Sequence, residues 1–142
     1  MPRFAMTAAT LLAILAGGPA LAGDAADRAA ILAGYAERAA ADDPAFTGFS
    51  AARGEELFRT RWAGGDARTP SCTACHTNDP RAQGRNAKTG RPIEPVAVSV
   101  EPDRFTDIDE VEKQFRRDCD AVLGRPCTPR EKGDYIAFMQ EQ

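Results

Sequence analysis

The stretch Cys72-Thr73-Ala74-Cys75-His76 decides how the fold of this 142-residue chain is interpreted. Two thiols three positions apart on a tight turn can each bond one vinyl group of the same porphyrin, and an adjacent imidazole then lies beneath the metal. The spacing C-x-x-C-H is therefore the attachment pattern of a c-type haem. We predict one covalent haem c held by Cys72 and Cys75, with His76 as the proximal iron ligand.

Two other kinds of site can contain such a cysteine pair. A thioredoxin-like pair normally follows a strand and opens a helix, whereas this pair follows two glycines and a Thr-Pro dipeptide. A zinc site needs a fourth ligand, which Cys119 or Cys127 could supply, but a histidine directly after a cysteine is poor zinc-finger spacing. The chain has a single histidine, which excludes any site built on two of them. The pattern therefore favours haem.

The composition is that of one small globular domain, with 43% hydrophobic and 27% charged residues. A chain of 142 residues is too short for two ordinary domains. The formal net charge of −3 argues against a nucleic-acid-binding protein, which would have an excess of basic residues.

Residues 1–22 have the pattern of a secretory signal peptide. Arg3 precedes an apolar run over residues 5–17, and Ala20-Leu21-Ala22 matches a cleavage site. The alternative is an uncleaved membrane anchor, but the run is shorter than the roughly 20 residues that a span needs. We predict a mature monohaem domain of residues 23–142, without a transmembrane segment, in the periplasm. Cysteine pairs form disulfides in that oxidising compartment.

Apolar residues at helical spacing, together with N-cap residues, predict an all-α fold of about four helices joined by long loops around the haem. We expect helices over residues 25–40, from Ser50 to about Thr60, from near Asp107 to Gly124, and from Thr128 through Met139. Residues 77–105 lack periodicity and form a long basic loop. Four basic residues lie in this loop: Arg81, Arg85, Lys88 and Arg91. They could form a solvated surface or a docking surface, or they could pair with the carboxylates of a bound group.

Cys119 and Cys127 lie eight positions apart, across a Gly124-to-Pro126 turn. In an exported protein a structural disulfide is the default for such a pair. The alternatives are two free thiols or a redox-active pair.

The sixth coordination position of the iron has no obvious ligand in this chain. Met1 and Met6 belong to the predicted signal peptide, and Met139 lies on the last helix, which should pack against the first core helix. The distal position is therefore either open or held by a weaker ligand than histidine or methionine.

Asp118 is a candidate for this position, because it shares a helix face with Val111 and Phe115. A carboxylate on an apolar face needs a partner, and iron would be one. The alternative is that Asp118 is exposed or pairs with Arg116 or Arg117.

Several motifs together resemble the sphaeroides haem protein family, a group of unusual class I cytochromes c. The resemblance covers roughly residues 29–140. It rests on Thr69 to His76, Lys88-Thr89-Gly90, Pro102 to Asp107, Val111-Glu112-Lys113, and Cys119 to Cys127 with Gly124-Arg125. Gly54, Phe58 and Tyr135 also match the general class I pattern, in which the first and last helices cross.

The resemblance implies a small class I cytochrome c fold with His76 as proximal ligand and a Cys119–Cys127 disulfide around the distal segment. The family's distal ligand is an asparagine directly before the first of these cysteines, and it leaves ferrous iron so that oxygen or another small ligand can bind. Asp118 occupies that position here. An ionised carboxylate favours ferric iron, and it cannot donate a hydrogen bond unless it is protonated. We therefore expect oxygen to bind more weakly here than in the rest of the family.

These inferences predict a periplasmic electron-transfer cytochrome, not an enzyme, with a labile distal ligand and another cytochrome as redox partner. A diatomic molecule such as oxygen would bind the vacated position. One alternative is a plain electron carrier whose haem stays six-coordinate. Another is a haem enzyme acting on peroxide or nitrogen oxides, for which Asp118 would be the only distal acid–base group.

Overall fold

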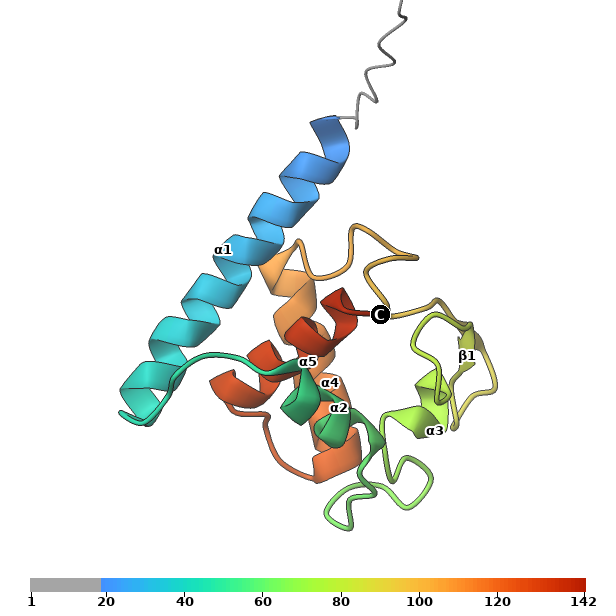
Figure 1. Ribbon diagram of the computed structural model, residues 1–142. Helices are drawn as coiled ribbons and strands as arrows, with labels where there is room; N and C mark the ends of the chain where they lie inside the picture. The colour runs from blue at the N-terminus through green and yellow to red at the C-terminus, as the bar shows by residue number, and fades with distance from the viewer. Residues whose placement is uncertain (1–18) are drawn as a thin grey trace, which may run out of the picture.

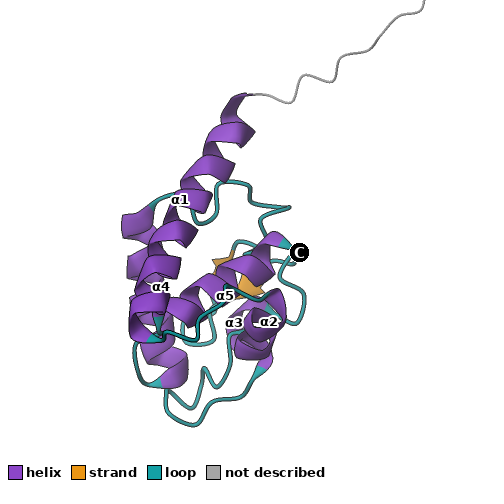
Figure 2. Ribbon diagram, turned by 60° about the vertical axis from the view of Figure 1, so that its left-hand side comes forward, coloured by secondary structure: helices purple, strands orange, loops and turns teal. Residues whose placement is uncertain are grey.

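The computed structural model describes residues 19–142 and shows a mostly helical chain, as predicted. Five helices and one small ladder lie in this range (Figures 1 and 2). The four predicted helices are all present, and the additional short one is the cysteine-containing turn. The elements are α1 (Pro19–Asp42), α2 (Ala51–Arg59), α3 (Thr73–His76), β1 (Gly84–Arg85), β2 (Pro92–Ile93), α4 (Ile108–Leu123) and α5 (Pro129–Gln140).

Most of the predicted signal peptide lies outside the described residues, and its cleavage stays a prediction. Helix α1 begins at Pro19, earlier than the predicted residue 25. Proline is tolerated in the first turn of a helix, where its missing N–H costs no hydrogen bond. None of the helices between residues 19 and 142 is long and apolar enough to span a membrane.

The predicted caps fix the starts of three helices. The Ser50 side chain accepts from the Arg53 N–H, and the Asp107 carboxylate accepts from two N–H groups at the start of α4. Thr128 and Glu131 form a capping box at α5. Gly124 ends α4 in the left-handed conformation, with φ of 69°.

Helices α2 and α5 cross at Gly54, and this crossing determines how closely they can pack. A Cβ atom at Gly54 would lie 2.0 Å from the carbonyl oxygen of Asp134 and 2.8 Å from Cβ of Phe138. The Asp134 carboxylate, on α5, accepts from the Ser50 N–H at 2.7 Å and from Arg53 Nε at 2.7 Å. A buried carboxylate of one helix thereby satisfies the N-terminus of the other.

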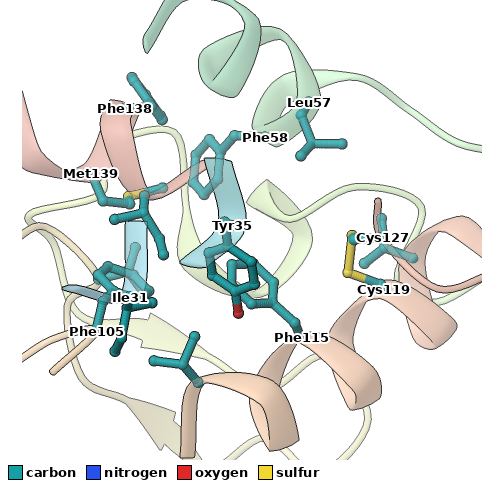
Figure 3. Close-up of a cluster of buried hydrophobic side chains, with 14 of the residues drawn as sticks. Ile31, Tyr35, Leu57, Phe58, Phe105, Phe115, Cys119, Cys127, Phe138 and Met139 are labelled. Atoms are coloured by element: carbon teal, nitrogen blue, oxygen red, sulfur yellow. A yellow bond between two sulfur atoms is a disulfide. The ribbon is translucent and has the colours of Figure 1, made fainter. Parts of the chain in front are cut away.

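The core lies where α1, α2, α4 and α5 meet (Figure 3). Its largest fully buried side chains are Tyr35, Phe58, Ile136 and Met139. Met139 packs in this cluster, as expected for a residue of the last helix.

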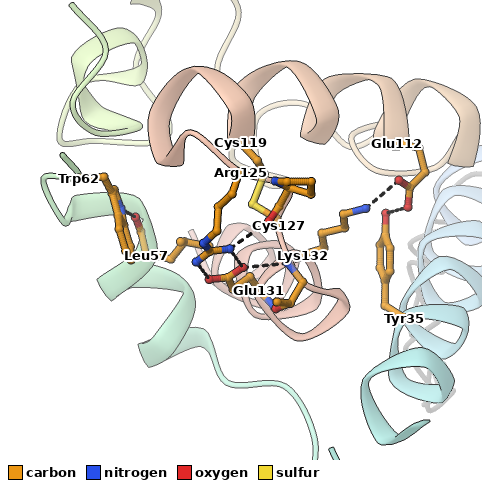
Figure 4. The surroundings of a disulfide bond; sticks show 11 residues. Tyr35, Leu57, Trp62, Glu112, Cys119, Arg125, Cys127, Glu131 and Lys132 are labelled. Carbon is orange, nitrogen blue, oxygen red and sulfur yellow. Dashed lines mark hydrogen bonds and ion pairs between the residues drawn. A yellow bond between two sulfur atoms is a disulfide. The ribbon is translucent and has the colours of Figure 1, made fainter. Parts of the chain in front are cut away.

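Glu112 links three of these helices. Its carboxylate accepts from the Tyr35 hydroxyl of α1 at 2.8 Å and from Lys132 Nζ of α5 at 2.7 Å (Figure 4). Burial raises the pKa of Glu112, but these two bonds outweigh it and lower the pKa overall. The carboxylate therefore holds α1 and α5 against α4. In Figure 1, α1 lies on the opposite side of α5 from α3 and β1.

Gly54→Ala should destabilise the protein by about 2–3 kcal/mol, because the new methyl group must push α2 away from the α5 backbone. Gly34→Ala on α1 is the matched control, since its Cβ would meet nothing within 4 Å. That control should be neutral or stabilise by up to about 1 kcal/mol through helix propensity. Urea unfolding of the haem-loaded proteins measures both, and equal stabilities for the two variants would refute the close crossing.

Candidate haem-binding site

The residues Cys72 to His76 form a single helical turn. Cys72 has helical backbone angles, and its carbonyl accepts hydrogen bonds from the Cys75 N–H at 3.2 Å and the His76 N–H at 3.0 Å. Thr77 ends the turn with φ of 62°. Both cysteines of the turn are free thiols. The two thiols and the imidazole are thus presented from one short and locally determined segment.

All three side chains line a cavity of about 420 Å³. The cavity has aromatic walls from Phe105, Phe115 and Tyr135, and aliphatic walls from α2 and α4. A wider hollow of about 610 Å³ lies along the outer face of α4, but neither His76 nor the two free cysteines line it. The chemistry that the motif predicts therefore belongs to the smaller cavity.

Burial in this cavity sets the protonation of the motif. It lowers the pKa of His76, which keeps the imidazole in the neutral form that can bind a metal. It also raises the pKa of Cys72 to about 12, and the nearby charge of Asp118 acts in the same direction. These shifts indicate that Asp118 lies close enough to both residues to act on them electrostatically.

The β1–β2 ladder closes over the attachment turn. A Cβ atom on Gly84 would lie 2.2 Å from the carbonyl oxygen of Cys75, and the Ala87 N–H donates to the Cys75 sulfur at 3.4 Å. Of the four basic residues predicted in this loop, Lys88 lines the cavity, while its ammonium pairs with Asp66 at 3.0 Å. The other three are exposed on the surface: Arg81, Arg85 and Arg91.

The structure places Asp118 in the cavity wall and confirms its pairing with Arg117, while its coordination of iron stays a prediction. Asp118 lines the cavity together with His76. Its carboxylate also pairs with Arg117 through two bonds, Nε to Oδ1 at 2.7 Å and Nη2 to Oδ2 at 3.2 Å. The Asp118 side chain is 48% exposed. Met139 is not among the residues lining the cavity.

The predicted disulfide between Cys119 and Cys127 is confirmed, with a Cα–Cα distance of 5.6 Å. It joins the last turns of α4 to the segment before α5, directly after Asp118 (Figure 4). It also excludes both cysteines as the fourth ligand of a zinc site. The turn that it closes packs against another loop, where a Cβ on Gly124 would lie 2.0 Å from the Gly64 carbonyl.

Sequence reasoning did not assign Arg104, Phe105 or Tyr135 to the site, although all three line the cavity. Arg104 and Phe105 belong to the Pro102–Asp107 stretch that carried the family resemblance. The class I pattern predicted for Tyr135 only a role in the packing of the crossing helices. The Pro102–Asp107 motif was the one sequence feature that pointed to Arg104 and Phe105. It has no periodic pattern, so it does not indicate which way its side chains face.

The residues present fit a covalent haem. Two free thiols and one neutral imidazole on one turn line a cavity with aromatic and aliphatic walls and a few charged side chains. No strand precedes the pair between residues 19 and 72, which argues against a thioredoxin-like motif. Fold and site together define a small c-type cytochrome.

Comparison with known proteins identifies the particular group. The cytochrome c-type protein SHP of Cereibacter sphaeroides is 46% identical over 137 residues, covering 96% of this chain and all of that protein. Cytochrome c'' of Methylophilus methylotrophus is 36% identical over 105 residues, covering 74% of this chain and 73% of that protein. The chain belongs to the SHP-like c-type cytochromes, and its residues 44–139 also place it in the family described as a domain of unknown function (DUF1924).

The solved structures agree with the sequence comparisons. The structure of oxidised SHP, described as an oxygen-binding cytochrome c, has a TM-score of 0.74 and 43% identity, covering 81% of this chain and 96% of that chain. The solution structure of cytochrome c'', which concerns haem-ligand detachment, has a TM-score of 0.71 and 32% identity. It covers 82% of this chain and 94% of that chain. The predicted cytochrome c fold and family are thereby confirmed.

Replacing both Cys119 and Cys127 by serine should lower the free energy of unfolding by about 2–3 kcal/mol, because the unfolded chain regains the entropy of the loop between them. Denaturant titration of the haem-loaded variant measures the loss. Reducing the wild-type disulfide should give a similar loss of stability. This control distinguishes the effect of the lost crosslink from the effect of replacing sulfur by oxygen. A variant as stable as the wild type would show that the bond contributes nothing to the fold.

Proposed function

We propose that this protein is a periplasmic monohaem c-type cytochrome that carries electrons, and that Asp118 is a labile distal ligand. In the proposal, Asp118 occupies the sixth position with ferric iron and leaves on reduction, so that a diatomic molecule such as oxygen can bind. The observation that carries the proposal is that Asp118 lines the cavity of His76 while its carboxylate already has a second partner, Arg117.

Haem c, when bound, would supply a one-electron redox couple. Cys72 and Cys75 hold it covalently, so it cannot dissociate. His76 supplies the proximal nitrogen, and its lowered pKa keeps that nitrogen unprotonated. Aromatic side chains form part of the cavity wall, namely Phe105, Phe115 and Tyr135.

Asp118 has two competing positions. A carboxylate binds ferric iron more strongly than ferrous iron because the ferric centre carries more positive charge. The Arg117 guanidinium offers it a fixed alternative through a fork of two charge-assisted bonds. This bond raises the pKa of Arg117, so the guanidinium is always available to receive the carboxylate. With haem bound, Arg117 would therefore receive the Asp118 carboxylate when the iron is reduced.

The relatives support this proposal through what is described for them. SHP is described as binding oxygen, and the cytochrome c'' study concerns detachment of a haem ligand. Asp118 differs from the amide expected in the family, and its negative charge should lower the reduction potential and weaken oxygen binding relative to an amide ligand.

Periplasmic location and partner complete the proposal. The predicted signal peptide over residues 1–22 and the Cys119–Cys127 disulfide both favour an oxidising compartment. A redox partner, another cytochrome, would supply or accept the electron. Among the described residues lining the cavity, Asp118 is the sole carboxylate and His76 is used proximally. This scarcity of acid–base groups favours a carrier over a haem enzyme.

One optical experiment tests the labile ligand. Ferric and dithionite-reduced spectra of the haem-loaded protein are recorded, and carbon monoxide is then added. We expect a high-spin ferrous spectrum and prompt binding of carbon monoxide. A low-spin ferrous spectrum unchanged by carbon monoxide would instead establish a permanently six-coordinate electron carrier.

Asp118→Ala tests the identity of the ligand in the same experiment. Its ferric spectrum should change, whereas Asp120→Ala, which removes an exposed carboxylate from the same helix, should leave the spectrum as in the wild type. If both variants keep the wild-type ferric spectrum, Asp118 is not the ligand.

Arg117→Gln should weaken carbon monoxide binding by roughly fivefold, because loss of the competing ion pair, worth about 1 kcal/mol, leaves Asp118 on the iron more often. Arg116→Gln is the control, since Arg116 is an exposed neighbour that does not line the cavity. Equal or tighter binding in Arg117→Gln would contradict a competition between iron and Arg117.

A further inference from the structure

We infer that Arg104 and Tyr135 form the binding site for a carboxylate of the haem, a propionate, and that Arg28 positions Arg104 from α1. The inference rests on the haem of the proposed function but not on the lability of Asp118. It assigns a task to three residues that lie outside the attachment motif.

The haem carboxylates need partners in this cavity. A carboxylate removed from water is costly unless a cation or hydrogen-bond donors meet it. Three cationic side chains line the cavity, namely Lys88, Arg104 and Arg117. Lys88 pairs with Asp66 and Arg117 pairs with Asp118, at 3.0 Å and 2.7 Å. Within residues 19–142, Arg104 is the cavity-lining cation without a carboxylate partner.

The Arg104 guanidinium is anchored but not saturated. Its Nε donates to the Pro95 carbonyl at 3.1 Å, which fixes the plane of the group. Its two terminal nitrogens have no hydrogen-bond partner in the part of the chain that the structure describes. Arg104 lines the cavity together with His76 and Tyr135. A guanidinium held this way offers a carboxylate two parallel donors.

The Tyr135 hydroxyl is a second unused donor. Its ring lies edge-on to Phe105, with centroids 6.1 Å apart, and to Phe115, at 5.6 Å. These contacts fix the direction of the ring. No hydrogen bond to its hydroxyl is formed by the described residues, and burial raises its pKa well above the usual value. The hydroxyl therefore stays protonated, and a haem carboxylate would satisfy it.

Arg28 holds the backbone that carries Arg104. It is 4% exposed, an unusual burial for an arginine. Its Nε donates to the Arg104 carbonyl at 2.9 Å, and its Nη2 donates to the Pro102 carbonyl. Phe105, the next residue, has φ of 62°, a conformation rare for a bulky side chain. The contact from α1 therefore fixes a strained segment that aims both Arg104 and Phe105 at the cavity.

The reduction potential of the haem-loaded protein, measured by spectroelectrochemical titration, tests the carboxylate site. Arg104→Gln should shift the redox equilibrium about tenfold toward ferric, or about 59 mV for one electron, because the lost cation stabilised the reduced state. Tyr135→Phe should shift it about threefold in the same direction. Arg81→Gln, the control, removes an exposed arginine paired with Asp79 and should shift it less than twofold. Equal shifts in Arg104→Gln and Arg81→Gln would overturn the carboxylate site.

A double-mutant cycle tests the positioning role of Arg28. Arg28→Gln should shift the potential in the direction of Arg104→Gln, and the double variant should shift no further than Arg104→Gln alone. Additive shifts would show that Arg28 acts independently. If Arg28→Gln does not fold, Arg28→Lys takes its place in the cycle, because it keeps the charge but cannot donate to both carbonyls in the same geometry.

The outcomes separate this inference from the proposed function. If the ferrous protein does not bind carbon monoxide but Arg104→Gln shifts the potential, the labile ligand is refuted and the carboxylate site is supported. The opposite pair of results would support the labile ligand and refute the carboxylate site. A chain that takes up no haem would overturn both.

Discussion

The candidate haem site depends on the single helical turn that presents Cys72, Cys75 and His76 together. A turn of this length has no core of its own, so every wall of the cavity must come from elsewhere in the chain. Helices α2, α4 and α5 and the loops before and after the β1–β2 ladder supply them. The close crossing of α2 and α5 at Gly54 and the Glu112 contacts hold these walls in place without help from the attachment turn.

The distal side is built differently from the proximal side. His76 is fixed by the same turn as the two thiols, whereas Asp118 lies on α4 and forms its ion pair with its own sequence neighbour, Arg117. The disulfide directly after Asp118 fixes the backbone of the helix end, while the carboxylate remains half-exposed. In the proposed function, a fixed backbone and a half-exposed carboxylate would allow Asp118 to exchange between iron and Arg117.

The sequence predicted the features that local chemistry determines. The attachment motif, the caps at Ser50, Asp107 and Thr128, and the Gly124 turn are all set by neighbours within a few residues, and the structure contains each of these caps and the turn. The disulfide followed from spacing and compartment. The position of Asp118 followed from helical periodicity, which correctly placed it toward the cavity and left its pairing open.

The remaining site residues depend on contacts between distant segments. Arg28 and the Arg104 carbonyl that it binds are 76 positions apart, and nothing near either residue in the sequence indicates the contact. The loop before α4 has no periodicity, so the inward direction of Arg104 and Phe105 could not be derived. The same holds for Lys88, which lines the cavity and pairs with Asp66, although it is exposed like its basic neighbours in the loop. Tertiary packing alone decides these orientations.

The proposed function requires one porphyrin bonded to Cys72 and Cys75 beside the imidazole of His76. Intact-protein mass spectrometry of the chain matured together with a cytochrome-maturation system measures this attachment. We expect a mass increase of one haem per chain under denaturing conditions, with the adduct confined to the peptide that contains Cys72 to His76. Unmodified thiols at both positions, with no tetrapyrrole adduct, would refute covalent attachment.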